Sequence, residues 1–425
     1  MHTSRRSLLR AVAAGAAVPL LGPRFLDTLE RRLEAFGDLP APSAASSEDY
    51  WSEIRRAFPV PDDYINLENG YSSPQPTPTF EAFVRHEAAI NRGLSFYMRR
   101  KKADDLWTVK RQIAELAGCP VDEIVVTRNT TESLGTVIHG LDLAPGDEAV
   151  MCDQDYGSML EQFRQQSRRR GIRCVEIAIP LHPGSDEEMV DTYARAITPR
   201  TKILLLSHMV NITGHILPVR KIADMAHARG VSVIVDAAHS FAHLVFAVPD
   251  LGGDYLGASL HKWLCTPLGA GLLQIRKDKI RTVWPLLGET SVPDDDIRKL
   301  ERIGTHPSWT VLAIGDAIRF HKMVGPERKE ARLRYLQQYW TDRVRDIPRV
   351  YLNTPVGNRA CGIANFGITG RAPGETADAL FDRFRIYTVA IDTVPVKGVR
   401  VTPHLYTTVA NLEALVQAIG ELARA

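Results

Sequence analysis

The central part of the chain alternates between short apolar runs and amphipathic stretches. The apolar runs, rich in β-branched and aliphatic residues, predict strands at 123–127, 148–152, 173–179, 202–209, 231–238 and 269–277. Helical periodicity appears between several of them, for example at 219–230, and also at 107–118, which ends at a glycine. Strands that are apolar on both faces and joined by helices form a parallel sheet covered on both sides. The pattern therefore predicts an α/β fold in which helices sandwich a mostly parallel sheet.

The pattern changes beyond residue 300. The predicted elements there are a long charged helix, two short strands and a closing helix, at 325–347, 362–368, 398–404 and 411–425. Asn411 is the expected N-cap of the closing helix. This mixture predicts a smaller α+β domain at the C-terminus.

The first residues form a unit of their own. Arg5 and Arg6 precede a short, Ala-rich apolar stretch that cannot span a bilayer. A charged start followed by such a stretch is typical of an export signal, and the paired arginines resemble the twin-arginine signal that exports folded proteins in bacteria. The alternative is a basic tail without structure. We expect export, which places the mature protein in the periplasm with no membrane insertion once the signal is removed.

These changes of pattern divide the chain into four parts. Residues 38–49, rich in Pro, Ala and Ser, have the composition of a linker. The expected parts are a twin-arginine signal peptide with its flank, a linker with an N-terminal segment, a large domain and a small C-terminal domain, at 1–36, 37–74, 75–300 and 301–425.

Composition excludes some partners. The 425 residues are 44% hydrophobic and 24% charged, which is ordinary for a soluble protein. A net charge of +2 provides no strong field for phosphate backbones, so nucleic acid is not expected as a partner. The five cysteines lack CxxC spacing and predict neither a zinc cluster nor a disulfide framework. His239 and His243 have i, i+4 spacing but no third ligand, so no metal is expected.

Polar residues follow the predicted strands at their carboxyl ends, where parallel sheets bind ligands. Thr130 and Thr131 follow the first strand at the start of a helix, which makes either an anion site for phosphate or simple N-capping. Tyr156 follows the second strand, and it either stacks on a flat ligand or is a half-buried aromatic. Asn211 follows the fourth strand. None of these residues is decisive alone.

A carboxylate and a lysine complete the set. Asp236 ends the fifth strand, where a carboxylate is costly to desolvate without a positive partner, and Lys262 comes after one further strand. The chain has neither GxGxxG after the first strand nor GxxxxGK[ST], which disfavours nicotinamide and ATP as ligands. Pyridoxal 5′-phosphate (PLP) needs a phosphate cradle, a carboxylate for its ring nitrogen and a buried amine for its aldehyde. The residues present match that combination.

The ordered segments TRNTTES, DQDYGS, NITGHILPV, DAAHS, SLHKW and GVRVTPH resemble the class V aminotransferase family of fold-type I PLP enzymes. The resemblance covers most of residues 60–425 and favours the isopenicillin N epimerase-like branch, because DAAHS stands where cysteine desulfurases usually have a glutamine. It implies a PLP-dependent transferase fold, with a large domain on a mostly parallel seven-stranded sheet and a smaller α+β C-terminal domain. It also implies a homodimer with shared active sites.

The same resemblance implies a role for each candidate residue. Lys262 would form the Schiff base with the cofactor and then move the substrate's α-proton, and Asp236 would pair with the ring nitrogen. Arg400 would bind the substrate's α-carboxylate in bidentate fashion. The other implied residues are Thr130, Thr131, Ser259 and His261 at the phosphate, Thr305 at the phosphate from the neighbouring subunit, His239 at the phenolic oxygen or the ring, Tyr156 stacked on the ring where the family usually has a histidine, and Asn211 beside the cofactor and the substrate carboxylate.

The expected function is that of a PLP enzyme acting on an amino acid, or on an amino-acid-containing metabolite, through an external aldimine. Epimerisation, transamination and elimination stay open, and tailoring of a secondary metabolite or siderophore would suit the periplasm. One alternative is a cysteine desulfurase or selenocysteine lyase-like activity, with Cys361 as the candidate nucleophile although it adjoins an apolar strand. Others are a sugar aminotransferase-type enzyme, whose substrate has no carboxylate, and a non-catalytic binding protein that retains the fold.

Overall fold

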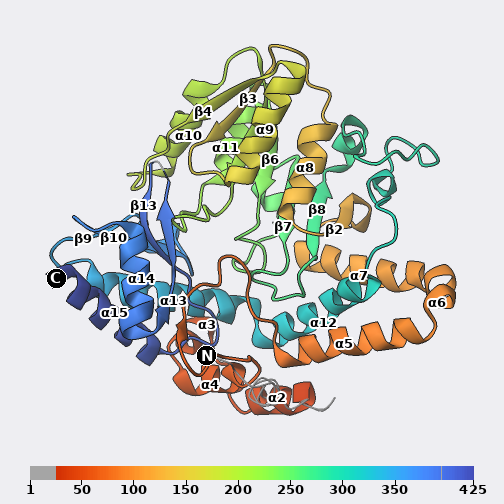
Figure 1. The fold of residues 1–425 in the computed structure, drawn as a ribbon. Helices are drawn as coiled ribbons and strands as arrows, with labels where there is room; N and C mark the ends of the chain where they lie inside the picture. Colours follow the sequence, from red (N-terminus) through yellow and green to blue (C-terminus); the bar gives the residue numbers. More distant parts are fainter. Residues whose placement is uncertain (1–24, 394) are drawn as a thin grey trace, which may run out of the picture.

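The computed structural model describes residues 25–393 and 395–425, and a seven-stranded sheet lies at its centre (Figure 1). The strand order is β2–β8–β7–β6–β5–β3–β4. The strands are β2 (Ile124–Thr127), β3 (Glu148–Cys152), β4 (Arg173–Ile177), β5 (Thr201–Ser207), β6 (Ser232–Asp236), β7 (Tyr255–Ser259) and β8 (Gly271–Ile275). β8 is antiparallel to both of its neighbours, and the other pairings in this sheet are parallel. The predicted mostly parallel, seven-stranded sheet is confirmed.

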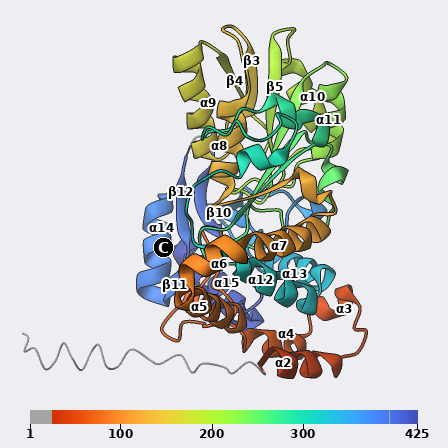
Figure 2. The ribbon, with the colours of Figure 1, turned by 90° about the vertical axis from the view of Figure 1, so that its right-hand side faces the viewer.

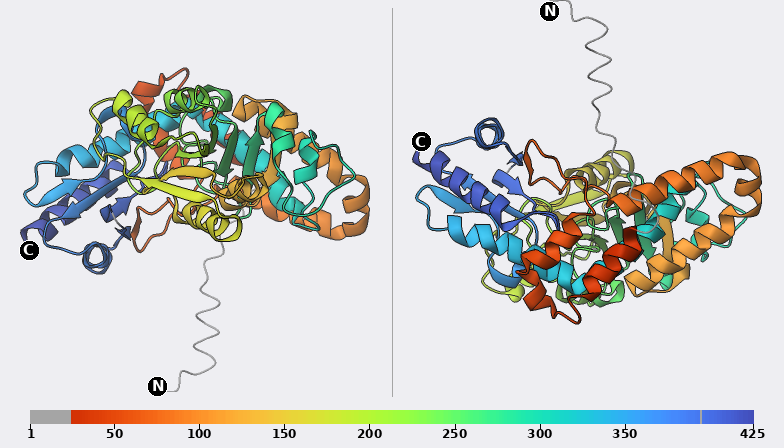
Figure 3. Two further views of the ribbon diagram at one scale, coloured as in Figure 1. Left: turned by 90° about the horizontal axis from the view of Figure 1, so that it is seen from above. Right: turned by 90° about the horizontal axis from the view of Figure 1, so that it is seen from below.

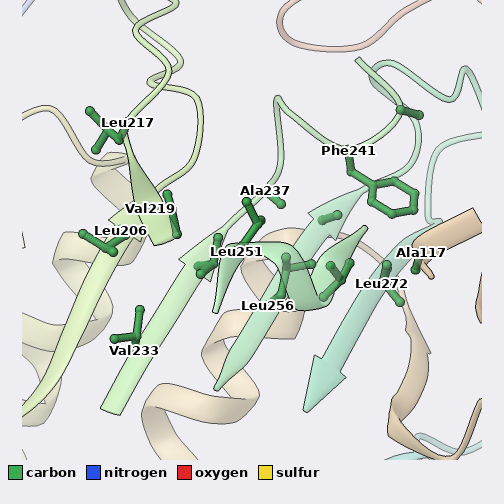
Figure 4. Packing of buried hydrophobic residues seen from close by; sticks show 14 of the residues in the cluster. Ala117, Leu206, Leu217, Val219, Val233, Ala237, Phe241, Leu251, Leu256 and Leu272 are labelled. Atoms are coloured by element: carbon green, nitrogen blue, oxygen red, sulfur yellow. The ribbon is translucent and has the colours of Figure 1, made fainter. Parts of the chain in front are cut away.

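Helices cover both faces of this sheet (Figure 2). The helices on one face are α8 (Thr130–Gly140) and α9 (Gly157–Arg170), and those on the other are α7 (Lys102–Ala117), α10 (Asp186–Ala196) and α11 (Val219–His227). Each face has its own apolar core. Within β6, Val233 and Val235 point into one core and Ile234 into the other, as the alternation of a strand requires. Figure 4 shows part of the core that contains Val233.

The C-terminal part has a second, antiparallel sheet of four strands. Its order is β12 (Val389–Asp392), β13 (Lys397–Val401), β10 (Ala364–Ile368) and β9 (Val350–Leu352). The helices whose side chains share its core are α13 (Pro326–Val344), α14 (Pro373–Phe384) and α15 (Val409–Arg424). β1 (Ile65–Asn66) and β11 (Ile386–Tyr387) pair in parallel beside this core. The predicted smaller α+β unit is present.

Three further helices lie at the opposite end of the molecule (Figure 3). They are α5 (Thr77–Arg92), α6 (Leu94–Arg100) and, packed on α5 and α7, α12 (Ser308–Val324). Val311 and Ile314 of α12 belong to a core of the large sheet, so the C-terminal core starts with α13, later than the predicted boundary at 301. None of the described helices is long and apolar enough to cross a membrane.

The predicted linker at 38–49 is wrong. This stretch forms α3 (Ala41–Ala45) and the start of α4 (Glu48–Arg55), and Ser47 caps α4 by accepting a hydrogen bond from Tyr50 N. Ala44 and Trp51 are buried, and Trp51 Nε1 donates to Ala44 O over 2.7 Å. Small Ala and Ser residues, which resemble a linker in composition, here allow short helices to pack closely.

The region predicted as a signal and its flank is described only from residue 25. There α2 (Phe25–Glu34) buries Leu29 and Leu33 in the core that also contains Tyr50. The twin-arginine motif, within residues 1–24, lies outside the described part of the chain.

The predicted cap of the last helix is also wrong. Thr408 is the N-cap of α15, and its hydroxyl accepts a hydrogen bond from Asn411 N. Asn411 lies one turn into the helix, where its side chain accepts from Thr408 N over 3.0 Å. The two residues therefore form a reciprocal capping box, so Asn411 contributes to the cap from the N3 position.

Candidate active site

The carboxyl ends of β5, β6 and β7 border a cavity of about 350 Å³. It is lined by the predicted residues Thr130, Thr131, Tyr156, Asn211, Asp236, His239, Ser259, His261, Lys262 and Arg400. Thr305 is not part of this lining, and it is exposed in the segment ahead of α12. The cavity wall also contains residues that the sequence did not single out: Gly70, Tyr71, Arg128, Asn129, Ser207, Met209, Ala238, Leu268 and Gly269.

The N-terminus of α8 forms one end of the cavity. Asn129 is the N-cap, and its side chain accepts a hydrogen bond from Glu132 N over 2.9 Å. Thr130 therefore does not cap the helix: its hydroxyl is 2.8 Å from Ser259 Oγ, and its backbone N donates to the same oxygen over 3.0 Å. The alternative of simple capping by the threonines is excluded.

Two further features of this end fit a phosphate group. A Cβ on Gly271 would lie 2.6 Å from Asn129 N, so β8 needs glycine there for the loop before α8 to pass. His261 Nδ1 is buried without a hydrogen-bond partner, and burial lowers the pKa of this histidine to about 4. The hydroxyl groups and the helix N-terminus together form an anion cradle, and His261 lies on the same cavity wall.

Lys262 also lines the cavity, in the loop that follows β7. Its Nζ is 2.8 Å from His239 Nε2, and Trp263 Nε1 donates to His239 Nδ1 over 3.4 Å. Because an indole nitrogen can only donate, Nδ1 accepts, and the neutral imidazole carries its proton on Nε2. That proton is directed at Nζ, so this hydrogen-bond arrangement belongs to the neutral amine, the form that predominates above a pH of about 8. Burial also favours the neutral form and lowers the pKa of Lys262 to about 8, with Arg400 acting in the same direction and Asp236 against it.

Asp236, the last residue of β6, is buried on the cavity wall. Its Oδ1 accepts a hydrogen bond from Ala238 N over 2.9 Å. Burial raises the pKa of Asp236, and the nearby Lys262 opposes that shift. A second buried carboxyl, Asp155, accepts from Ser207 Oγ over 2.7 Å, and burial raises the pKa of Asp155 to about 7. A protonated ring nitrogen would give Asp236 the cation that a buried carboxylate requires.

Arg400 of β13 reaches the same cavity from the C-terminal sheet. Its Nη1 donates to Asn211 O over 3.0 Å, and its Nη2 forms a 2.7 Å ion pair with Glu68 Oε1. Asn211 therefore meets the arginine through its backbone. Sequence reasoning missed Glu68, because no local pattern links it to a residue 332 positions away.

Tyr156 is the N-cap residue of α9 and follows the short turn after β3. Its side chain is 45% exposed, so its ring lies at the open side of the cavity wall. The ring is therefore accessible to a ligand in the cavity.

None of the five cysteines lines this cavity. Cys361 is buried, and burial raises its pKa to about 12, while the pKa of the buried Cys265 rises to about 11. A nucleophilic thiol needs a lowered pKa and access to its substrate. Within residues 25–393 and 395–425, no group of three or more His, Cys, Asp or Glu side chains is placed to hold a metal ion.

The link between Trp263 and His239 leads to a test of pH dependence. Removing the indole N–H in Trp263→Phe frees His239 to place its proton on Nδ1 and to accept at Nε2 from a charged Lys262. We expect the pKa of Lys262 to rise from about 8, by roughly one unit for the loss of one such hydrogen bond. The rate at which the apoprotein takes up PLP, followed by the cofactor's absorbance, will then rise at higher pH than in the wild type.

A matched control is available in Trp340→Phe. Trp340 is equally buried but belongs to the core of the C-terminal sheet, where its Nε1 has no hydrogen-bond partner. This substitution should leave the pH profile of cofactor uptake in place. Equal profiles for the two variants would contradict the assigned tautomer of His239.

The comparisons with known proteins agree with this chemistry. The class-V aminotransferase family model matches residues 75–411. An isopenicillin N epimerase from Amycolatopsis lactamdurans is 28% identical, over 88% of this chain and 99% of that protein. An isopenicillin N epimerase from Streptomyces clavuligerus is 26% identical, over 88% of this chain and 98% of that protein. A probable cysteine desulfurase from Pyrococcus abyssi is 25% identical, over 88% and 97%.

Solved structures share the fold. The cystine C-S lyase C-DES, in complex with its product cysteine persulfide, has a TM-score of 0.79 at 20% identity, covering 86% of this chain and 99% of that one. The cysteine desulfurase CsdA from Escherichia coli has a TM-score of 0.77 at 22% identity, covering 88% and 98%. A variant of C-DES was solved with glycine covalently linked to its PLP cofactor.

The family match, which spans most of the chain, and the fit of the cavity to the cofactor lead to one assignment. The cavity provides a buried amine with a lowered pKa, a buried carboxylate and an anion cradle, which are the three groups that PLP requires. The protein belongs to the class V aminotransferase family of PLP-dependent enzymes.

Proposed function

We propose that the enzyme acts at the α-carbon of an amino acid, or of an amino-acid group within a larger metabolite. The observation that carries this proposal is that Lys262 and Arg400 lie on the wall of one cavity. An arginine can pair with an α-carboxylate in bidentate fashion and so orient the substrate. A lysine with a pKa of about 8 can take up and return a proton near neutral pH. PLP, when bound, withdraws electrons from the α-carbon.

The remaining residues of the cavity have supporting tasks. Asp236 would keep the ring nitrogen of bound PLP protonated, and the hydroxyls of Thr130, Thr131 and Ser259 would hold its phosphate. Tyr156 provides a flat surface against the ring. The hydrogen bond between the buried Thr130 and Ser259 hydroxyls and the one that Asp236 accepts from Ala238 N agree with these tasks.

Among the reactions open to such a site, epimerisation is the first to test. Its support is the similarity to two isopenicillin N epimerases over almost their full lengths. Transamination and elimination use the same lysine and stay within the proposal. Desulfuration has weaker support, because the chain places no cysteine on the cavity wall.

A half-reaction screen tests the proposal and separates these reactions. The holoenzyme is mixed in deuterated buffer with amino acids and with peptides that have a free α-amino and α-carboxyl group. We expect at least one compound to exchange its α-hydrogen with solvent. Exchange with inversion indicates epimerisation, and conversion of the cofactor to its pyridoxamine form indicates transamination. Failure of all carboxylate compounds, with exchange from amines that lack a carboxylate, would reject the proposed substrate class.

We also propose that the enzyme is an exported homodimer. The support for export is the twin-arginine sequence at Arg5 and Arg6, and a pathway for folded cargo suits a protein that must acquire a cytoplasmic cofactor first. The support for a dimer is that Thr305 is exposed and lies outside its own chain's cavity lining. If Thr305 contacts a cofactor phosphate, as the family resemblance implies, that phosphate belongs to a neighbouring subunit.

A further inference from the structure

Residues 67–73, which we call the strap, run along one side of the cavity. At one end Leu67 O accepts a hydrogen bond from Thr402 N over 2.8 Å, and at the other Ser73 N donates to His261 O over 3.1 Å. Gly70 and Tyr71 form part of the cavity wall. The strap is thus fixed to the C-terminal part at one end and to the active-site loop after β7 at the other.

Within the strap, Glu68 is paired with the proposed carboxylate-binding residue. Glu68 Oε1 accepts from Arg400 Nη2 over 2.7 Å and from Tyr71 N over 2.8 Å. The Glu68 and Arg400 side chains are only 7% and 9% exposed. A Cβ on Gly70 would lie 2.7 Å from Arg400 Cζ, so a side chain at position 70 would displace the guanidinium group from its present place against the strap. The arginine therefore already has an internal carboxylate as its partner.

This ion pair leaves hydrogen-bonding capacity unused on both sides. Glu68 Oε2 and Arg400 Nε are buried and have no hydrogen-bond partner. A carboxylate that approaches a guanidinium group in bidentate fashion makes two parallel bonds, and here Glu68 makes one. A substrate carboxylate can therefore replace Glu68 at Arg400, but the displaced Glu68 charge must then find other partners.

We propose that Glu68 is a specificity-determining residue that competes with the substrate carboxylate for Arg400. The inference rests on the proposed function, since it takes Arg400 as the carboxylate-binding residue. A small free amino acid gains little beyond its carboxylate contact and must break the pair to obtain it. An amino-acid group carried by a larger molecule contacts more of the cavity, and this remote binding energy offsets the loss of the pair. The site thereby favours amino-acid groups of larger metabolites over small free amino acids.

Two carbonyl reagents test the competition without a known substrate. Aminooxyacetate and methoxyamine attack the cofactor of the holoenzyme with the same aminooxy group, but only aminooxyacetate has a carboxylate. The ratio of their second-order rate constants, measured from the cofactor's absorbance and divided by the ratio for free PLP, reports carboxylate recognition by the protein. The ratio is measured for the wild type, Glu68→Gln and Arg400→Ala.

We expect Glu68→Gln to raise this ratio about tenfold, which corresponds to one charge-assisted hydrogen bond no longer lost on binding. The glutamine keeps an oxygen for Tyr71 N, so the strap retains its turn. An unchanged or lower ratio in Glu68→Gln would overturn the competition. Glu68→Ala, which removes the carboxylate in another way, must change the ratio in the same direction.

Arg400→Ala distinguishes a failure of the proposed function from a failure of the role of Glu68. If this variant has the wild-type ratio, Arg400 does not recognise carboxylates and the proposed function fails. If Arg400→Ala lowers the ratio and neither Glu68 variant raises it, the proposed function stands and the role of Glu68 is rejected. Circular dichroism and the cofactor content of each variant show that the compared proteins are folded and loaded.

Discussion

Replacing Lys262 with methionine will lower turnover by at least about 10⁴-fold, because the variant loses both the amine that holds the cofactor's aldehyde and the base that moves the α-proton. Borohydride reduction and peptide mapping should place the cofactor on the Lys262 peptide of the wild type and find no such adduct in the variant. Lys262→Arg should be equally inactive, since a guanidinium group stays protonated at neutral pH. Lys221→Ala, which removes an exposed lysine in a surface ion pair, should retain activity.

The Lys262→Met substitution will also stabilise the apoprotein. Burial lowers the pKa of Lys262 from 10.5 to about 8, so at pH 7 the folded state holds a charged amine where a neutral one is favoured. Lys262→Met removes that penalty and should raise the free energy of unfolding by roughly 1–3 kcal/mol at pH 7. The wild type gains stability as pH rises from about 8 to 10.5, where the unfolded state binds more protons, so the advantage of the variant will shrink over that range. A lower free energy of unfolding for the variant at pH 7 would contradict the conclusion that burial of the charged Lys262 amine destabilises the folded state.

Local patterns were sufficient to predict most of the fold. The strand at 148–152 and the long helix near 325–347 match β3 and α13 closely, because continuous apolar runs and helical periodicity are properties of neighbouring residues. The prediction of a linker at 38–49 was wrong because it also relied only on neighbouring residues. Its composition is that of a linker, and its helices are held by contacts with distant residues, such as the hydrogen bond from Arg332 to Ala45 O.

The residues of the active site also differ in whether the sequence could identify them. Asp236 and Lys262 could be found because they follow predicted strands, and Arg400 could be found through the family resemblance. The residues that hydrogen-bond to the Arg400 side chain and to His239 could not be found in this way. The Glu68–Arg400 pair joins residues 332 positions apart, and the role of Trp263 depends on which nitrogen of His239 its indole reaches. The first contact depends on how the C-terminal sheet lies against the strap and the second on how two loops after neighbouring strands meet, and no periodicity encodes either.

Together these partners set the charge of the cavity. His239 and burial favour a neutral Lys262, Asp236 favours a charged one, and Glu68 balances Arg400. The pKa of the Lys262 amine therefore lies at about 8, so that it can lose and regain its proton close to physiological pH.

Replacing Asp236 with asparagine will lower turnover by about 10²–10³-fold, the range typical of losing one preorganised electrostatic contact to a developing charge. Asparagine keeps the oxygen that accepts from Ala238 N, so the loop after β6 can retain its shape. The carboxylate is lost, and with it the partner that keeps the cofactor's ring nitrogen protonated. The variant should therefore bind PLP more weakly and show an altered absorbance spectrum, both measured by titration of the apoprotein.

Asp236→Asn should also shift the pH at which the apoprotein takes up PLP, in a direction that a purely structural defect would not produce. The negative charge of Asp236 raises the pKa of Lys262, so its removal should lower that pKa below about 8. PLP uptake by the Asp236→Asn apoprotein will then begin at lower pH than in the wild type, opposite to the shift expected for Trp263→Phe. Asp254→Asn is the matched control: Asp254 is fully buried, pairs with Arg276 and does not line the cavity, so this variant should lose stability but keep the pH profile. A shift to higher pH in Asp236→Asn would mean that the carboxylate does not act on the lysine.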